Sequence, residues 1–219
     1  MSISVKICGL KTEETIEAAI RCGASHVGFI FFEKSPRNVA PETAALLAQQ
    51  VRDRAKTVAV TVNADNASLD DIVARVSPDM LQLHGKESPQ RVEEIKKRYG
   101  LPVIKAIPLR EQGDLALMEP YRGIVDQFLF EAKPPADSEL PGGNGIPFDW
   151  HILSSLDGSV NYMLSGGLDA ENVGAALLQT GARALDLSSG VESAPGVKDI
   201  GLIDRFFDAV RQGETAGTA

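Results

Sequence analysis

Short hydrophobic runs alternate along the chain with longer stretches whose hydrophobic residues recur at a helical period. The runs are rich in valine, isoleucine and other residues that favour strands. They predict strands at Val5–Cys8, His26–Phe31, Thr57–Val62, Met80–His84, Val103–Ile107, Gln127–Phe130, Asn161–Leu164 and Ala184–Leu187. The stretches between and after them predict helices at Thr12–Cys22, Pro41–Arg52, Leu69–Val76, Pro89–Arg98, Asp169–Gln179 and Leu202–Arg211.

Eight strands that alternate with helices pair in parallel through right-handed crossovers. The 219 residues leave about 27 for each of eight units, which suits a compact α/β fold, a single (β/α)8 TIM barrel with a parallel eight-stranded barrel. An open doubly wound sheet is the alternative, but it usually carries a G-x-G-x-x-G loop after its first strand. The loop here is Gly9-Leu10-Lys11-Thr12. We therefore predict one barrel domain over residues 1–211 and a polar, flexible tail over residues 212–219.

The composition, 43% hydrophobic and 24% charged, is that of a globular protein. A formal charge of −8 argues against nucleic-acid and membrane-surface partners, which attract basic proteins. No apolar run approaches the roughly 20 residues of a membrane span, and the N-terminus lacks a signal-peptide pattern. The two cysteines, Cys8 and Cys22, are too few for a disulfide framework, so we predict a cytoplasmic location. A monomer is the default expectation, and a homodimer is possible.

Ionisable and small polar residues gather where the predicted strands end, which is the catalytic face of such a barrel. Two of the loops there, Ser165-Gly166-Gly167 and Ser188-Ser189-Gly190, are predicted to open helices and to bind phosphate through backbone N–H groups. The long irregular stretch Ala132–Pro147 has the length of a lid or binding loop, and its Gly142-Gly143-Asn144-Gly145 segment could form a third wall. The alternative is that these glycines only make tight turns.

Cys8 and Glu131 are the candidates for a base and an acid. Cys8 shares a strand face with Lys6, and a cation beside a thiol lowers the pKa of the thiol. A buried apolar cysteine is the alternative. Glu131 directly follows an apolar strand, where burial favours the protonated, acid form. The alternative is a solvated loop glutamate.

Arg37 lies in a predicted βα loop and could bind a substrate carboxylate with its guanidinium fork, although a plain surface arginine is the alternative. His84 shares a strand face with Gln82. The three histidines, His26, His84 and His151, have no close His/Asp pairing, so neither a metal nor another cofactor is predicted.

Several strings at the predicted strand ends together resemble the phosphoribosylanthranilate isomerase family, and the resemblance runs through nearly the whole chain. They are V-K-I-C-G-L at 5–10, G-A-S-H-V-G-F-I-F at 23–31, S-P-R at 35–37, L-Q-L-H-G at 81–85, P-G-G-N-G-I-P-F-D-W at 141–150, L-S-G-G-L at 164–168, L-D-L-S-S-G-V-E at 185–192 and P-G-V-K-D at 195–199.

The resemblance implies an Amadori rearrangement in tryptophan biosynthesis, in which an acid opens a ribosyl ring and a base then removes the C2′ proton. It implies that Cys8 is the base and that Arg37 faces the anthranilate carboxylate. It also implies a phosphate site and a pocket lining formed by Gly143, Gly166, Gly167, Ser189 and Gly190 together with His84 and Asp186. The partner would be a phosphorylated small molecule.

One position departs from the family pattern. The family acid is an aspartate after strand six, in a string such as L-L-D-x-K, where this chain has L-F-E-A-K with Glu131. Either carboxylic acid suits the chemistry, since their pKa values differ by only ~0.4 in model peptides. Reach is the larger concern, because an error of about 1 Å in position can cost on the order of 100-fold in rate. We predict that Glu131 is the acid and that the enzyme is active.

Other functions remain as alternatives. A metal-dependent epimerase needs a His/Asp set that the chain does not offer, and a Schiff-base aldolase needs a lysine at a strand end, whereas Lys105 lies mid-strand. The related isomerase of the histidine pathway usually pairs two aspartates, whereas strand one offers Cys8. The alternative of a binding protein that has lost activity is supported only by the replacement of the family aspartate with Glu131.

Overall fold

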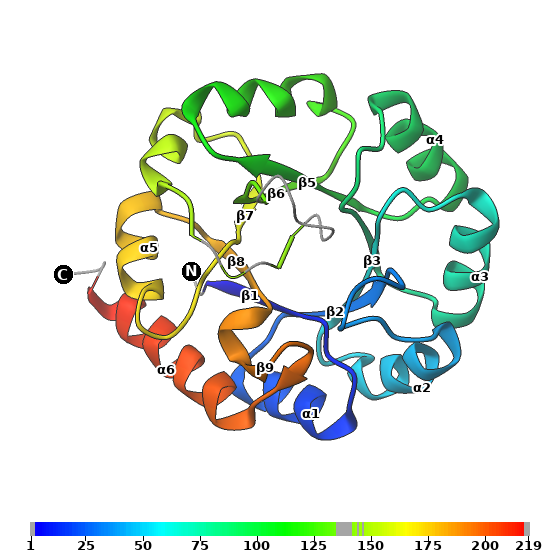
Figure 1. Cartoon of the computed structure of the whole chain (residues 1–219), viewed down its shortest axis with the longest axis horizontal. Helices are drawn as coiled ribbons and strands as arrows, with labels where there is room; N and C mark the ends of the chain where they lie inside the picture. Colours follow the sequence, from blue (N-terminus) through cyan, green and yellow to red (C-terminus); the bar gives the residue numbers. More distant parts are fainter. Residues whose placement is uncertain (1–2, 135–141, 144, 146, 217–219) are drawn as a thin grey trace.

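Eight parallel strands close into a single barrel in a computed structural model that describes residues 3–134, 142–143, 145 and 147–216. Each strand pairs with its neighbours in chain order, and the eighth pairs with the first, as Figure 1 shows in a view along the barrel. The strands are β1 Ser4–Cys8, β2 His26–Phe31, β3 Lys56–Thr61, β4 Met80–Leu83, β5 Val103–Leu109, β6 Gln127–Ala132, β7 Tyr162–Leu164 and β8 Ala184–Leu187. The predicted fold class is confirmed, and each strand lies within two residues of its predicted bounds.

Helices form the outer ring of the barrel (Figure 1). The α-helices are α1 Glu13–Cys22, α2 Pro41–Val51, α3 Asn66–Val76, α4 Pro89–Tyr99, α5 Val173–Thr180 and α6 Ile200–Ala216. The 3-10 segments η1 Gln112–Tyr121 and η2 Trp150–Ser155 take the helix positions after β5 and β6. Helix α6 runs five residues beyond its predicted end at Arg211, and Glu214 Oε1 accepts a hydrogen bond of 2.6 Å from Ile3 N. The first residues of the predicted tail are therefore helical.

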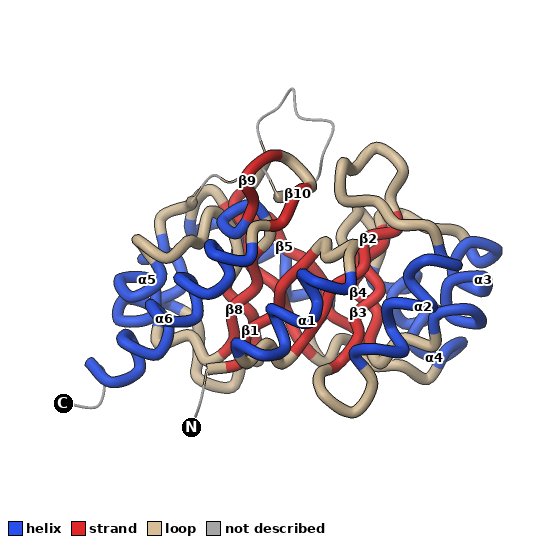
Figure 2. Tube along the Cα trace, turned by 90° about the horizontal axis from the view of Figure 1, so that it is seen from below, coloured by secondary structure: helices blue, strands red, loops and turns tan. Residues whose placement is uncertain are grey.

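The segment after β8 differs most from prediction. It first forms the short 3-10 helix η3, Ser189–Val191, and then a small antiparallel hairpin of β9, Glu192–Ala194, and β10, Val197–Lys198. In the side view of Figure 2 this hairpin stands above the C-terminal ends of the barrel strands. The last helix begins only after it.

Local signals explain several helix boundaries. Thr12 caps α1 by accepting a hydrogen bond from Thr15 N, and Gly23 ends that helix in a left-handed conformation. Helix α5 begins at Val173 rather than at the predicted Asp169. The Asp169 carboxylate accepts hydrogen bonds from the backbone N–H groups of Glu171 and Asn172, which forms a local turn in place of the first helical turn.

The barrel interior is apolar toward the N-terminal ends of the strands and holds polar side chains nearer their C-terminal ends, at the catalytic face. Apolar side chains such as Val58, Ile104, Leu129 and Met163 fill the inside. Buried polar side chains also lie within the barrel, namely Lys6, Gln82, Glu131, Ser165 and Asp186. Since burial of unpaired polar groups is costly, these side chains must be paired with one another or serve a ligand.

The half-buried histidine at the start of β2 gives a stability prediction. Burial lowers the pKa of His26 to about 4, and the charges of Lys6 and Lys56 act in the same direction. Between pH 6.5 and 4 the unfolded chain therefore binds a proton that the folded chain does not, so the free energy of unfolding falls as the pH falls. We expect His26→Gln to remove about 2 kcal/mol of this fall, allowing for partial exposure.

Urea unfolding of both proteins at pH 7 and pH 4.5 measures this difference. His151→Gln, at an exposed position, is the control. Parallel losses of stability in wild type and His26→Gln would contradict the prediction.

Candidate active site

A cavity of about 860 Å³, counted with its open mouth, lies at the C-terminal ends of the strands. Nine of the ten predicted site residues line it, namely Cys8, Arg37, His84, Glu131, Gly143, Gly166, Gly167, Asp186 and Ser189. Gly190 does not line it. Of the segment predicted as a third wall, Gly142, Gly143 and Gly145 line the cavity, while Asn144 lies outside the described residues.

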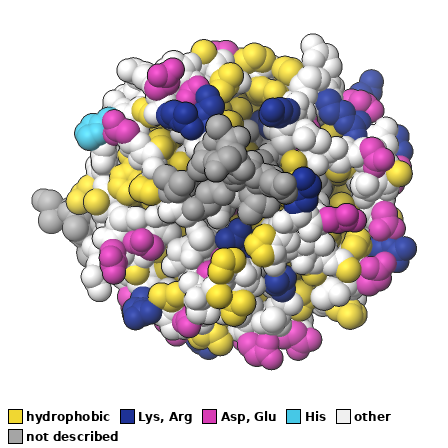
Figure 3. All heavy atoms as spheres, in the orientation of Figure 1, with side chains coloured by type: hydrophobic (Ala, Val, Ile, Leu, Met, Phe, Trp, Pro, Cys, Tyr) yellow, Lys and Arg dark blue, Asp and Glu magenta, His cyan; other side chains and the backbone are white. Residues whose placement is uncertain are grey.

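The electrostatic environment of this face differs from that of the whole chain. Figure 3 shows Lys and Arg side chains at several points around the centre of the face, and Asp and Glu side chains mostly toward its edge. An acidic protein can bind an anionic ligand where the local potential is positive.

Cys8 ends β1 with its side chain inside the barrel, on the same face as Lys6, as predicted. The Lys6 ammonium forms a buried ion pair of 2.7 Å with Asp186. Gly28, the β2 partner of Cys8, leaves room for both side chains, because a Cβ there would lie 3.1 Å from the Cys8 sulfur and 3.1 Å from Lys6 Nζ. The thiol therefore lies beside a charged pair rather than in a purely apolar core.

The predicted lowering of the Cys8 pKa is wrong. Burial raises the pKa of the thiol above its usual value near 9, and Lys6 offsets only part of this effect. The reason is that Asp186 neutralises much of the Lys6 charge and itself opposes thiolate formation. Burial alone would lower the pKa of Lys6, but Asp186 and Cys8 raise it, so the ammonium stays charged.

Glu131 lies inside the barrel near the end of β6 and is only 4% exposed, which excludes a solvated loop glutamate. Its Oε1 lies 2.5 Å from His84 Nε2 as an ion pair. Gln82 Nε2 lies 2.8 Å from the other ring nitrogen of His84. Burial lowers the pKa of His84, but Glu131 more than offsets this, so the pKa is raised above 6.5.

A second buried pair holds the segment that carries His84. Lys105 faces outward from the barrel and forms an ion pair of 3.1 Å with Glu87, and it also donates to Gly85 O. Glu87 accepts from the backbone N–H groups of Gly85 and Asn63. Lys105 lies within β5, as the sequence indicated, and does not line the cavity.

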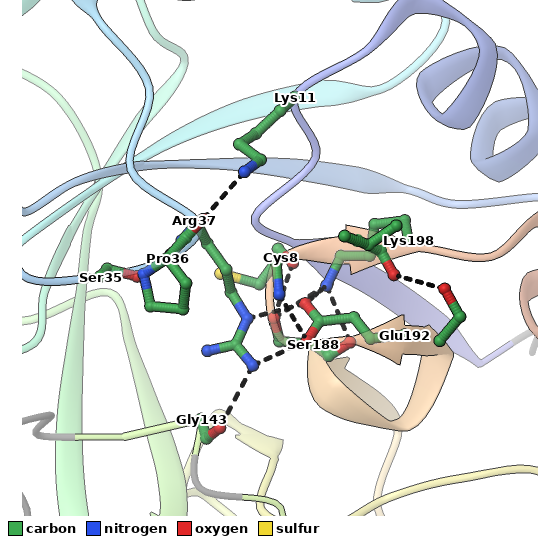
Figure 4. A network of polar contacts seen from close by, with 12 residues as sticks. Cys8, Lys11, Ser35, Pro36, Arg37, Gly143, Ser188, Glu192 and Lys198 are labelled. Carbon is green, nitrogen blue, oxygen red and sulfur yellow. Dashed lines mark hydrogen bonds and ion pairs between the residues drawn. The ribbon is translucent and has the colours of Figure 1, made fainter.

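Arg37 is only 5% exposed, so it is not a surface arginine. Its predicted role as a fork for a ligand carboxylate needs correction, because Glu192 already occupies that fork. Arg37 Nε donates to Glu192 Oε1 at 2.7 Å, and Nη2 donates to Glu192 Oε2 at 2.9 Å (Figure 4). Only Nη1 has no hydrogen-bond acceptor among the described residues.

Glu192 and Lys198 form a buried ion pair that was not predicted from the sequence. Lys198 Nζ donates to Glu192 Oε1 at 2.7 Å and to Ser188 Oγ at 2.9 Å, and the Ser188 hydroxyl donates to Cys8 O at 2.9 Å. Burial opposes ionisation of both groups. Even so, Arg37 and Lys198 hold the pKa of Glu192 at about 2, while that of Lys198 falls to about 8. Both residues lie in strings of the family resemblance, which was the only available signal.

The two glycine loops meet at the rim. Gly166 and Gly167 have φ of 91° and 65°, a left-handed backbone that favours glycine. A Cβ on Gly190 would lie 1.9 Å from Leu168 O, so Gly190 allows the two loops to touch. Neither loop opens an α-helix directly, since a turn follows the first and η3 the second. The first N–H groups of η3 have no partner within that helix, which suits an anion.

The fold and the cavity define a barrel enzyme that carries buried ionisable side chains at the C-terminal ends of its strands. The sequence profile of the N-(5'phosphoribosyl)anthranilate (PRA) isomerase family matches residues 5–209. The chain belongs to this family.

Similar proteins agree with this assignment. The chain is 65% identical to the N-(5'-phosphoribosyl)anthranilate isomerase of Sinorhizobium fredii, over 98% of this chain and 96% of that one. It is 64% identical to that of Rhizobium meliloti, over 98% and 100%. Among solved structures, the phosphoribosyl anthranilate isomerase of Thermotoga maritima has a TM-score of 0.86 at 32% identity, covering 96% and 99%. Another, in complex with reduced 1-(o-carboxyphenylamino)-1-deoxyribulose 5-phosphate, has a TM-score of 0.83 at 30% identity, covering 96% and 99%.

The described residues contain neither a candidate membrane-spanning helix nor a candidate metal site. None of their helices is both long and apolar enough to cross a membrane. Their His, Cys, Asp and Glu side chains form no group of three that could hold a metal ion.

Proposed function

We propose that the chain converts N-(5-phosphoribosyl)anthranilate into 1-(2-carboxyphenylamino)-1-deoxyribulose 5-phosphate, with Cys8 as base and Glu131 as acid. One observation carries the assignment of roles: a buried thiol from β1 and a buried carboxyl from β6 line the same cavity. The glycine loops after β7 and β8 lie at the same cavity, where barrels commonly bind phosphate. A cytoplasmic location belongs to this proposal, and the two free cysteines support it. A monomer stays the default expectation, with a homodimer as the alternative.

Ring opening is the first step. Glu131 donates a proton to the furanose ring oxygen, and the C1′–O bond breaks with its electron pair going to that oxygen. The anthranilate nitrogen forms a double bond to C1′ and gives a protonated Schiff base. This role requires the Glu131 carboxyl group to carry a proton when the substrate binds. Burial and the contact with His84 support the role by fixing that group at the cavity.

Proton removal from C2′ is the second step. The Cys8 thiolate takes this proton, and the electron pair forms a C1′–C2′ double bond and neutralises the nitrogen. The enolamine then becomes the ketose as C1′ gains a proton and the C2′ hydroxyl loses one. The protons balance if Cys8 returns its proton to C1′ and Glu131 recovers one from the hydroxyl.

Charged and glycine-rich groups bind the two ends of the substrate. The backbone N–H groups around Gly166, Gly167, Ser189 and Gly190 bind the phosphate, with Gly143 nearby. The Arg37 guanidinium binds the anthranilate carboxylate. Asp186 keeps Lys6 in place beside the thiol, since the two form a buried ion pair.

The test follows the fluorescence of phosphoribosylanthranilate when purified protein is added. We expect the signal to fall at a rate proportional to protein concentration and to depend on Cys8. Tight binding of the substrate without loss of signal would favour a binding protein that has lost activity.

A further inference from the structure

Glu192, at the start of the β9–β10 hairpin, is shared by two buried cations. Its carboxylate forms ion pairs of 2.7 Å with Arg37 and of 2.7 Å with Lys198. The three side chains are at most 5% exposed. A buried charge is tolerated only when it is paired and hydrogen-bonded, so removal of this carboxylate would leave two cations facing each other.

The contacts of Glu192 leave one guanidinium nitrogen of Arg37 for a ligand. Nε and Nη2 donate to Glu192, and Nη2 also donates to Gly143 O at 3.4 Å. Figure 4 shows Nη1 on the side of the guanidinium away from Glu192. Arg37 lines the cavity, and none of the described residues accepts a hydrogen bond from Nη1.

The backbone at Arg37 is held as well. Arg37 N donates to Ser35 Oγ at 3.2 Å, and Lys11 Nζ donates to Pro36 O at 2.8 Å (Figure 4). Gly9 lies against the stem of the side chain, since a Cβ there would come within 2.9 Å of Arg37 Cδ. The arginine is therefore fixed at both ends, and Glu192 fixes the end that meets a ligand.

We propose that Glu192 is a positioning residue that sets substrate specificity by holding Arg37 so that Nη1 meets the carboxylate on the aromatic ring of the substrate. The inference rests on the proposed function. It predicts that Glu192 matters for ligands that carry this carboxylate and much less for ligands that lack it. A residue needed only for folding would affect both kinds of ligand alike.

Two stable ligands separate these cases. One is reduced 1-(o-carboxyphenylamino)-1-deoxyribulose 5-phosphate, and the other is the same compound with hydrogen in place of the carboxylate. Titration calorimetry gives the ratio of their dissociation constants. We expect wild type to bind the carboxylated ligand about 10- to 100-fold more tightly, as for one hydrogen bond to a charged group. In Glu192→Gln we expect the ratio to fall below about threefold, with the ligand without the carboxylate bound nearly as in wild type.

Glu119→Gln is the matched control. Glu119 also binds an arginine with both carboxylate oxygens, Arg122 Nε at 3.0 and 2.9 Å, but at the surface and far from the cavity. We expect this variant to leave the ratio unchanged. If Glu192→Gln does not fold, Glu192→Asp carries the test, because the shorter carboxylate keeps its charge but moves Arg37, and the ratio should again fall.

The outcomes separate the two proposals. An equal loss of affinity for both ligands in a folded Glu192 variant overturns the positioning role and leaves the proposed function intact. Failure of wild type to bind either ligand overturns the proposed function, and the inference with it.

Discussion

Cys8→Ser is expected to lower kcat by a factor on the order of 10² to 10⁴, the usual contribution of a positioned acid or base. Serine keeps the size and the hydrogen-bonding capacity of the side chain, but a hydroxyl ionises far less readily than a thiol. Binding of the reduced product analogue should change little, because the phosphate loops and Arg37 are untouched. The loss of signal in the fluorescence assay measures kcat.

The pH profile gives the Cys8 prediction a second readout. Because burial raises the pKa of the thiol above 9, the thiolate fraction increases with pH through the neutral and alkaline range. Since the mechanism needs Glu131 protonated as well as Cys8 ionised, kcat/KM reports both groups at once. The ultraviolet absorbance of the thiolate, taken as the difference between wild type and Cys8→Ser, reports Cys8 alone, and we expect it to increase through the alkaline range.

Cys22→Ser is the matched control for this substitution. The Cys22 thiol donates to Asp204 at the outside of the barrel, so activity should be unchanged. A Cys8→Ser enzyme with wild-type turnover would require another base.

Glu131→Gln is expected to lower kcat by a similar factor, on the order of 10² to 10⁴, because glutamine has the shape of glutamate but no proton to deliver. The substitution also removes the group that raises the pKa of His84. Burial is then the dominant influence, and the pKa of His84 should fall below 6.5. Steady-state kinetics measure the first effect, and an NMR titration of the His84 ring measures the second independently of activity.

Glu131→Asp tests whether the site has adapted to the longer side chain. Aspartate is the residue that the family pattern carries here, but it withdraws the carboxyl group from His84 by one methylene. Since a shift of about 1 Å can cost on the order of 100-fold, we expect kcat between those of wild type and Glu131→Gln. Wild-type turnover by Glu131→Gln would identify some other group as the proton donor.

The sequence predicted most of the strands because their signal is local. Alternation of apolar runs with helical periods depends on residues a few positions apart, and the eight runs appear in the barrel nearly as predicted. The two-residue period of a strand placed Lys6 on the same face as Cys8, and Gln82 on the same face as His84, because side chains two residues apart on a strand share a face. The small hairpin after β8 was missed because strands of two or three residues have no readable period.

The site was less predictable wherever it depends on pairs distant in sequence. Arg37 and Glu192 are 155 residues apart, and Lys6 and Asp186 are 180 apart. Strand parity shows which face a side chain takes, but not which charge meets it across the barrel. For this reason the guanidinium fork was predicted to be free, and the pKa of the thiol was predicted to fall.

The sequence alone thus determines the order of the strands and which side chains face the barrel interior. It also determines the end of the barrel at which the ionisable residues lie, and the candidate acid and base among them. Each of these follows from short-range periodicity and from position at a strand end. The partner of each buried charge, and with it the direction of the pKa shifts of Cys8 and His84, is decided by barrel closure. Closure brings β1 against β8 and puts β4 and β6 around one cavity. Electrostatic effects depend on distance and burial in three dimensions, and the order of residues along the chain contains neither.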